Sequence, residues 1–277
     1  PEVAHRLAAE HPEARLAVAD SLPALVAGLK APRRIILMVP AGPAVDAVLD
    51  SLDGLLEERD VVVDAGNSLF SDTDRRLARA AGRPWRFVGM GVSGGAEGAL
   101  KGPAIMPGGD RESYELMAPM LQAIAAQGSG GPTVGWCGNG SAGHFVKMVH
   151  NGIEYGDMQL IAEVAMLLRE GLALPGDEVA RIFDRWNEGE LESFLVEITS
   201  DIFRTPDPAS PDRRLLVDAV LDQAGQKGTG RWTVIAAAEL GVPIPTITAA
   251  VDARNLSAAR PLRLQAAKAL GEGRAAV

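Results

Sequence analysis

Short apolar runs alternate with amphipathic stretches from residue 15 to about residue 135, and this alternation constrains the fold more than any other feature of the chain. Three apolar runs predict strands, and each ends in a turn of small or polar residues: 34–39, 61–64 and 86–90. The spacing of the apolar residues in 45–56 and 73–81 predicts helices between them. Strands joined by crossover helices form a parallel sheet, and ligands bind at the carboxyl edge where the turns meet.

The chain changes character after Gly138. One long periodic segment without proline covers residues 141–171, and the rest is helical in pattern with two proline-rich interruptions. We therefore predict an α/β domain over residues 1–138, with an incomplete Rossmann-like doubly wound parallel sheet. An all-α domain is predicted to follow over residues 139–277.

Charge and composition exclude several classes of partner. The formal net charge of −9 opposes nucleic-acid binding, because the phosphates would be repelled and the basic residues are scattered. No apolar run approaches the length of a membrane span, and the N-terminus lacks a signal-peptide pattern. Cys137 is the only cysteine, so no intrachain disulfide can form. We expect a cytoplasmic protein without nucleic-acid or membrane partners.

The long periodic segment carries polar side chains on one side of its predicted helix. Lys147, Asn151 and Glu154 follow one another at intervals of four and three residues, so they face the same way. Two further polar residues flank this face: His150 and Tyr155. Four apolar residues occupy the other sides, where we expect them to pack: Phe145, Val146, Val149 and Ile153.

This polar face has two interpretations. Lys147 and Glu154 could form an ordinary solvated ion pair. However, asparagine, histidine and glycine are poor choices for an exposed helix. Lysine is also rare among the 27 basic residues, and arginine cannot act as a base whereas lysine can. The pattern therefore favours proton transfer, with Lys147 as the candidate base.

Three motifs resemble the 6-phosphogluconate dehydrogenase family. Residues 143–160, GHFVKMVHNGIEYGDMQL, resemble its signature. Residues 89–99, GMGVSGGAEGA, are similar to its substrate loop, and residues 225–233, GQKGTGRWT, to its phosphate-contacting segment. The resemblance implies a homodimeric, metal-free enzyme of the pentose phosphate pathway and gluconate utilization. Such an enzyme oxidises 6-phospho-D-gluconate with NADP and releases CO2 and D-ribulose 5-phosphate.

The resemblance also implies roles for individual residues. Lys147 would be the general base that accepts the proton of the 3-hydroxyl, and Glu154 the general acid that protonates the enediol. The other residues expected to bind substrate are Ser93, Gly94, Gly95, His150 and Asn151, with Tyr155, Lys227 and Arg254 on the phosphate. The residues expected to contact the cofactor are Val39, Ala41 and Asn67.

The chain departs from the family pattern in several places. Pro40 stands where the family usually has lysine, and Ala96 replaces one glutamate of the substrate loop. We expect the chain to be truncated at both ends. The Gly-rich turn and the N-R-T segment of the first β-α-β unit, and the C-terminal tail that reaches the partner subunit, would lie outside it.

Two other functions are compatible with parts of the pattern. Another β-hydroxyacid dehydrogenase would share Ser-Gly-Gly and the K-x-x-x-N spacing, but not the continuation H-N-G-I-E-Y or the segment G-Q-K-G-T-G. A non-catalytic sugar-phosphate-binding remnant would keep the substrate residues after losing the first β-α-β unit. Faster turnover of 3-hydroxyisobutyrate than of 6-phosphogluconate would favour the first alternative, and a remnant is expected not to bind NADP.

Overall fold

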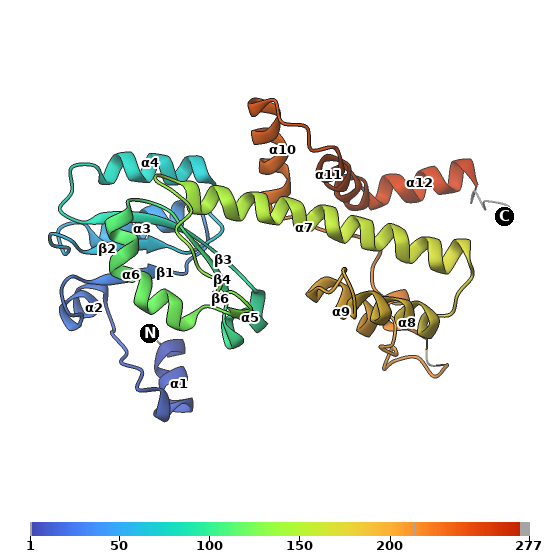
Figure 1. The fold of residues 1–277 in the computed structure, drawn as a ribbon, viewed down its shortest axis with the longest axis horizontal. Helices are drawn as coiled ribbons and strands as arrows, with labels where there is room; N and C mark the ends of the chain where they lie inside the picture. The colour runs from blue at the N-terminus through green and yellow to red at the C-terminus, as the bar shows by residue number, and fades with distance from the viewer. Residues whose placement is uncertain (1, 213, 272–277) are drawn as a thin grey trace. The chain divides into compact units, whose positions relative to one another are not determined.

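The computed structural model describes residues 2–212 and 214–271 of the chain. The chain divides into two compact units, residues 1–149 and residues 150–277. The helix α7 (Ala142–Met166) begins in the first unit and continues into the second. Figure 1 labels the helices and strands.

A four-stranded sheet forms the centre of the first unit, with the strand order β1-β2-β3-β4. Its strands are β1 (Arg34–Leu37), β2 (Val61–Asp64), β3 (Arg86–Ser93) and β4 (Ala104–Pro107). The first three are parallel, which confirms the predicted sheet, while β4 runs antiparallel to β3. β4 was not predicted, because this short strand follows Pro103, ends at Pro107 and lacks a long apolar run. Further along the chain, a small hairpin is formed by two antiparallel strands of two residues each, β5 (Gln127–Gly128) and β6 (Gly131–Pro132).

Helices cover both faces of this sheet, which confirms the doubly wound arrangement. On one face, Val62 of β2 packs in a core with Leu49 of α3; on the other, Val61 and Val63 pack with Met117 of α6. All three valines are fully buried, so β2 is a central strand with protein on both sides. The helices of this unit besides α7 are α1 (Glu2–Glu10), α2 (Leu22–Gly28), α3 (Pro43–Leu52), α4 (Phe70–Ala80), α5 (Gly95–Lys101) and α6 (Arg111–Ile124).

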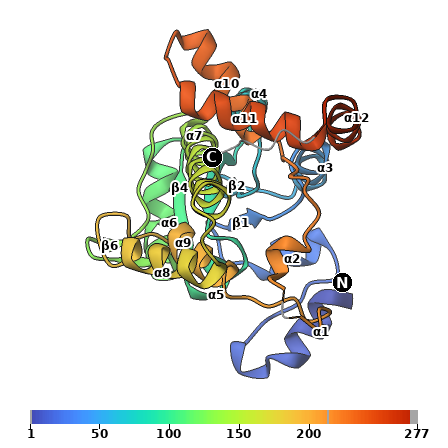
Figure 2. The same cartoon turned by 90° about the vertical axis from the view of Figure 1, so that its right-hand side faces the viewer.

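The second unit is helical, as predicted. After α7 and a short π-helical turn at Leu167–Gly171, its helices are α8 (Gly176–Asn187), α9 (Phe194–Ile202), α10 (Thr229–Leu240), α11 (Pro245–Ala258) and α12 (Arg260–Leu270). Phe183 of α8 and Val196 of α9 share one core. Tyr155 of α7 packs against Ala250 and Val251 of α11 in another, and both views show α11 beside α7 (Figures 1 and 2).

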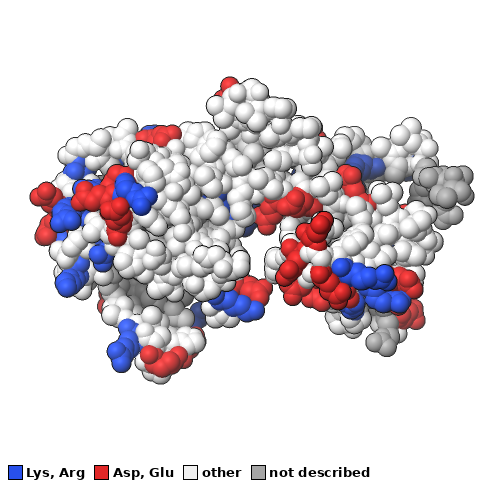
Figure 3. All heavy atoms as spheres, viewed as in Figure 1, with Lys and Arg blue, Asp and Glu red and all other residues white. Residues whose placement is uncertain are grey.

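The surface of the second unit is uneven in charge. Charged side chains gather over α8 and α9, while the surface over α10 is largely uncharged (Figure 3). Ile235 and Leu240 of α10 are among its exposed apolar residues. Among the described residues, no helix has the length and apolarity that crossing a membrane requires.

The expectation that Val146 and Ile153 pack is wrong. Val146 is 39% exposed and Ile153 is 51% exposed. These residues are seven positions apart on α7, so they share a side of the helix, and that side is open to solvent. Phe145 does make a ring contact, edge to face with Phe70 at 5.2 Å between centroids.

Candidate active site

Lys147 and Ser93 meet in the first unit. Lys147 is only 7% exposed, and its Nζ donates a hydrogen bond of 2.9 Å to Oγ of Ser93, the last residue of β3. The two residues are 54 positions apart in the sequence. The structure therefore places the candidate base against the strand end that carries the Ser-Gly-Gly turn.

Glycines allow α7 to approach the sheet at this point. A Cβ on Gly91 of β3 would lie 2.3 Å from Cβ of Lys147. A Cβ on Gly143 of α7 would lie 2.4 Å from the carbonyl oxygen of Met106 and 2.5 Å from that of Gly89. Contacts this short are impossible for real side chains, so glycine at both positions sets how close Lys147 comes to β3.

The turn after Ser93 also depends on glycine. Gly94 has φ +138° and Gly95 has φ +58°, a region that favours glycine. A Cβ on Gly94 would come within 2.8 Å of Cα of Gly98, whereas the space beside Gly95 is open. The turn thus presents its backbone next to the Lys147–Ser93 pair without side chains in the way.

The second unit holds the other candidate residues of α7. His150 Nδ1 and Asn151 Oδ1 are 3.1 Å apart, and Asn151 Nδ2 donates to Oγ1 of Thr229 at 3.4 Å. Thr229 is the first residue of α10 and follows the glycine-rich segment that contains Lys227. Glu154 is half-buried on the same helix.

Tyr155 and Arg254 lie together, as candidate phosphate residues should. Tyr155 is buried, and the guanidinium carbon of Arg254 lies 4.7 Å from the centroid of its ring. Arg254 also donates a hydrogen bond of 2.7 Å to the carbonyl of Gly225. A Cβ on Gly230 would collide with the Tyr155 ring at 2.9 Å, so this glycine lets α10 pack against α7.

The segment that carries Lys227 is tied to α11. The amide of Ala224 donates to Oγ of Ser257 at 2.8 Å, and Gln226 Nε2 donates to Oδ1 of Asn255 at 2.7 Å. Lys227 itself is exposed. These bonds hold the segment beside Arg254, so two of the three candidate phosphate residues, Tyr155 and Arg254, are in contact and the third sits on a tethered loop.

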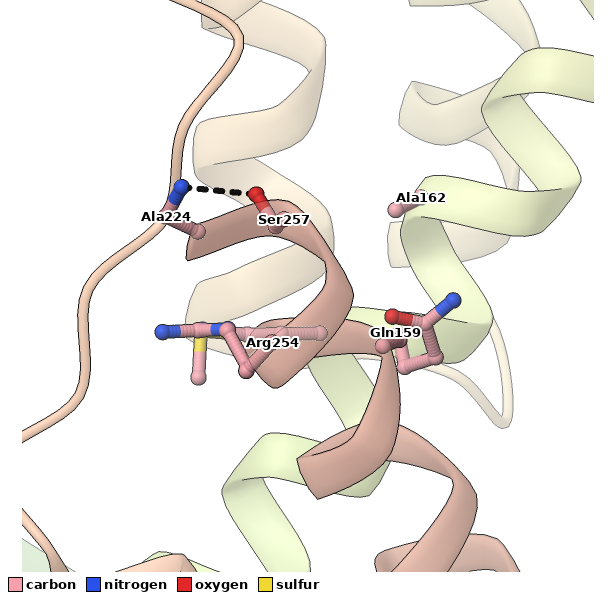
Figure 4. A pocket seen from close by; sticks show the side chains of 7 residues that line it. Gln159, Ala162, Ala224, Arg254 and Ser257 are labelled. Atoms are coloured by element: carbon pink, nitrogen blue, oxygen red, sulfur yellow. Dashed lines mark hydrogen bonds between the residues drawn. The ribbon is translucent and has the colours of Figure 1, made fainter. Parts of the chain in front are cut away.

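A pocket of about 240 Å³ adjoins Arg254 in the second unit. Figure 4 shows Arg254 and Ser257 of α11 on one side and Gln159 and Ala162 of α7 on the other. The pocket therefore lies further along α7 than Tyr155, next to the candidate phosphate residues.

The candidate cofactor residues lie in turns at the carboxyl ends of β1 and β2. Val39 and Ala41 follow β1, and Asn67 follows β2. The two turns touch, since a Cβ on Gly66 would be 3.3 Å from the carbonyl oxygen of Val39. Gly42 has φ +96° and precedes the first residue of α3. Closely spaced, glycine-containing turns at this edge fit one half of a dinucleotide.

His144, three residues before Lys147, is a buried polar residue that the sequence reading did not assign. Its Nδ1 lies 2.6 Å from Oγ1 of Thr73 in α4. Burial lowers the pKa of His144 below its ordinary value of 6.5, although the carboxylate of Asp64 acts in the opposite direction. His144 is thus held neutral between α4 and the start of α7.

This shift predicts a loss of stability on mild acidification. The unfolded chain takes up a proton at His144 below pH 6.5, while the folded chain resists protonation until its lower pKa is reached. The contribution of neutral His144 to the free energy of unfolding is therefore fully present above pH 6.5. Below that pH it falls by up to about 1.4 kcal/mol per pH unit. Urea unfolding at stepwise lower pH should show this slope, and His144→Gln should flatten it; equal slopes would contradict the assignment.

The sequence reading missed Gly91, Gly143, Thr73 and His144. One signal was present: Gly89 lies inside the predicted strand 86–90 and Gly91 directly follows it, and glycine inside a strand often marks close backbone approach. Nothing local indicated which segment would approach.

Cys137 does not have the environment of a reactive thiol. Burial raises the pKa of the Cys137 thiol, which is the opposite of what an activated thiolate requires. In the part of the chain that the structure describes, no group of three or more histidine, cysteine, aspartate or glutamate side chains could hold a metal ion.

Comparison with protein families matches both parts of the chain. Residues 1–138 match the NAD binding domain of 6-phosphogluconate dehydrogenase, and residues 143–276 match the 6-phosphogluconate dehydrogenase C-terminal domain. The decarboxylating 6-phosphogluconate dehydrogenase of Raoultella planticola is 49% identical over 270 residues. That alignment covers 97% of this chain and 60% of the relative, so the chain spans well under two thirds of the relative's length.

Two solved structures of dehydrogenases are similar to the chain in fold. Plasmodium falciparum 6-phosphogluconate dehydrogenase, described in its apo form and in complexes with NADP+ and with 6-phosphogluconate, superposes with a TM-score of 0.93 at 38% identity. The alignment covers 100% of this chain and 59% of the Plasmodium chain. A Mycobacterium tuberculosis 3-hydroxyisobutyrate dehydrogenase superposes with a TM-score of 0.65 at 24% identity. The alignment covers 92% of this chain and 83% of the dehydrogenase chain. This second likeness shows a shared fold.

Proposed function

The chain belongs to the 6-phosphogluconate dehydrogenase family, and from that membership we propose that it serves the oxidative decarboxylation of 6-phospho-D-gluconate to D-ribulose 5-phosphate and CO2, in the pentose phosphate pathway and gluconate utilization. The observation that carries this proposal is the buried Lys147, whose Nζ is hydrogen-bonded to Ser93 beside an open glycine turn. The 49% identity to a decarboxylating relative supports the same chemistry.

Lys147 is proposed as the general base of the oxidation. Its amine accepts the proton of the substrate 3-hydroxyl as that carbon becomes a ketone. NADP, when bound, supplies the hydride acceptor. The hydrogen bond from Nζ to Ser93 orients the amine, and the glycines at positions 91 and 143 let it lie close to the strand end.

The same residue is proposed to assist decarboxylation. Once protonated, the ammonium of Lys147 polarises the new ketone, so that the electron pair left by departing CO2 is accommodated as an enediol. Glu154, seven residues further along α7, then donates a proton to the enediol carbon while the Lys147 amine takes back the proton of the enediol hydroxyl, which yields ribulose 5-phosphate. This use of Lys147 needs no metal ion.

The remaining residues are proposed to hold the substrate. Tyr155 and Arg254 are in contact and Lys227 lies on the loop tied to α11, which supports phosphate binding by these three. The hydrogen bond between His150 and Asn151 supports a shared role in binding sugar hydroxyls. Ser93, Gly94 and Gly95 are proposed at the substrate carboxylate, because both glycines are exposed and no side chain of their own covers the backbone there.

The cofactor, the domain division and the assembly complete the proposal. NADP is proposed to bind at Val39, Ala41 and Asn67, and the Plasmodium falciparum relative has a structure in complex with NADP+. These residues lie in the proposed first domain, residues 1–138. The proposed second domain is residues 139–277. We propose a cytoplasmic homodimer on the strength of the family resemblance. Sedimentation of the purified chain tests the dimer.

Turnover of the purified chain tests the function. With 6-phosphogluconate and NADP, we expect NADPH and CO2 to form in equal amounts. Faster oxidation of 3-hydroxyisobutyrate would favour another β-hydroxyacid dehydrogenase. Binding of 6-phosphogluconate by calorimetry without any turnover would instead identify a sugar-phosphate-binding remnant.

A further inference from the structure

Arg76 of α4 is an arginine buried in the first unit. Its side chain is 0% exposed. Nε and Nη2 each donate a 3.0 Å hydrogen bond to the carboxylate of Asp46 in α3, and Nη2 also donates at 2.9 Å to the carbonyl of Gly42. Nη1 lies 3.4 Å from Oδ2 of Asp64, at the end of β2. One guanidinium therefore contacts two different strand-following regions.

Asp64 extends this contact into the turn that follows β2. Its Oδ1 accepts a hydrogen bond of 3.1 Å from the amide of Gly66, and its Oδ2 accepts one of 2.6 Å from Oγ of Ser68. Arg76 Nη1 also reaches Oγ of Ser68 at 3.5 Å. The residue between these two contacts is Asn67, so its backbone is held on both sides.

Stability alone is a weak reason for such an arrangement. Burying the guanidinium and the Asp64 carboxylate, with Asp46 left 24% exposed, costs desolvation energy, and a well-packed apolar group of similar volume is often as stable. What an apolar group cannot do is donate hydrogen bonds to four defined residues, as Arg76 does to Gly42, Asp46, Asp64 and Ser68. The fork geometry of Arg76 instead specifies the relative placement of the turn after β1 and the turn after β2.

We propose that Arg76 is a positioning residue that holds turns 40–42 and 65–68 in one arrangement, and so fixes the backbone that presents Val39, Ala41 and Asn67. The link to the cofactor rests on the proposed function. The holding of the two turns does not, because it concerns the ligand-free chain.

Arg33 provides a matched control at the opposite ends of the same two strands. Its side chain is 13% exposed, and it donates to Oδ2 of Asp60 at 2.9 Å and to the carbonyl of Val26 at 3.0 Å. Arg33 directly precedes β1 and Asp60 directly precedes β2. Arg33→Lys therefore weakens a buried ion pair on the same strands without touching the carboxyl-edge turns.

Hydrogen exchange of the ligand-free chain is the deciding measurement. Arg76→Lys keeps the positive charge but loses the planar set of guanidinium donors. We therefore expect the amides of Ala65 and Gly66 to exchange faster by about tenfold or more. The amides of Val62 and Val63 should keep wild-type rates. Arg33→Lys should accelerate exchange near Glu57, whose amide donates to Asp60, and leave Ala65 and Gly66 unchanged. Unchanged turn amides in Arg76→Lys, or equal acceleration across the sheet, would overturn the proposal.

Two additions keep the test decisive. If Arg76→Lys does not fold, Asp46→Asn removes the negative charge of a partner that is 24% exposed, and it should accelerate exchange at the same turn amides by a smaller factor. Calorimetry with NADP should show affinity reduced about tenfold by Arg76→Lys and within about twofold for Arg33→Lys. A wild-type chain that does not bind NADP contradicts the proposed cofactor, while the exchange result still decides the role of Arg76.

Discussion

Replacing Lys147 with arginine is expected to abolish turnover of 6-phosphogluconate while largely preserving binding of the sugar phosphate. Arginine keeps the positive charge but does not deprotonate, so it cannot take the 3-hydroxyl proton. Loss of a general base lowers kcat by about 10²–10⁴-fold. Lys147 is also buried at 7% exposure, with Gly91 of β3 against the start of its side chain.

The measurement is kcat from NADPH formation, with 6-phosphogluconate affinity taken from calorimetry on the same protein. Lys268→Arg is the matched control, since this lysine is exposed in α12 and the same chemical change should leave both quantities unaltered. Substantial turnover by Lys147→Arg would remove Lys147 as the base and leave only a positioning role on Ser93.

Gly143→Ala is expected to destabilise the first unit by about 3 kcal/mol or more, because the added methyl group meets only backbone atoms. Its Cβ would lie 2.4 Å from the carbonyl oxygen of Met106, 2.5 Å from that of Gly89 and 2.6 Å from the amide nitrogen of Gly108. Backbone atoms of a sheet cannot rotate away, so the start of α7 must move off β3. That movement also withdraws Lys147 from Ser93.

Gly156→Ala in the same helix is the control. Its nearest neighbour would be Cγ2 of Thr246 at 3.6 Å, an ordinary contact. Alanine is a better helix former than glycine, so this variant should gain about 0.5–1 kcal/mol. Urea unfolding of both variants measures the difference, and a Gly143→Ala protein as stable as the wild type would show that α7 does not depend on this close approach.

Much of the architecture followed from local patterns. The apolar runs that became β1, β2 and β3 are short and end in small residues, and the proline-free periodic segment became α7 with its π-helical turn. These elements need no distant partner to be recognised, because each shows its own period. β4 was missed, since four residues beside prolines carry too little pattern.

The candidate site, like the fold, was only partly predictable from local patterns. Residue types and spacing along one helix singled out Lys147, Asn151 and Glu154, because helical periodicity alone brings them to one side. The resemblance of whole motifs then suggested roles for residues elsewhere, such as Lys227 and Ser93. Those roles stay proposals, and the turnover and binding experiments test them.

The order of amino acids was enough to predict three strands, the long helix and the residues on its polar face, because those relations depend on neighbours in the chain. The contact of Lys147 with Ser93, 54 positions away, and the packing of Gly143 against the backbone of β3 and β4 became visible in the folded chain alone. The fold alone placed Arg76 between two turns. The physical reason is that steric exclusion and buried hydrogen bonds act between segments distant in sequence, where no local period records them.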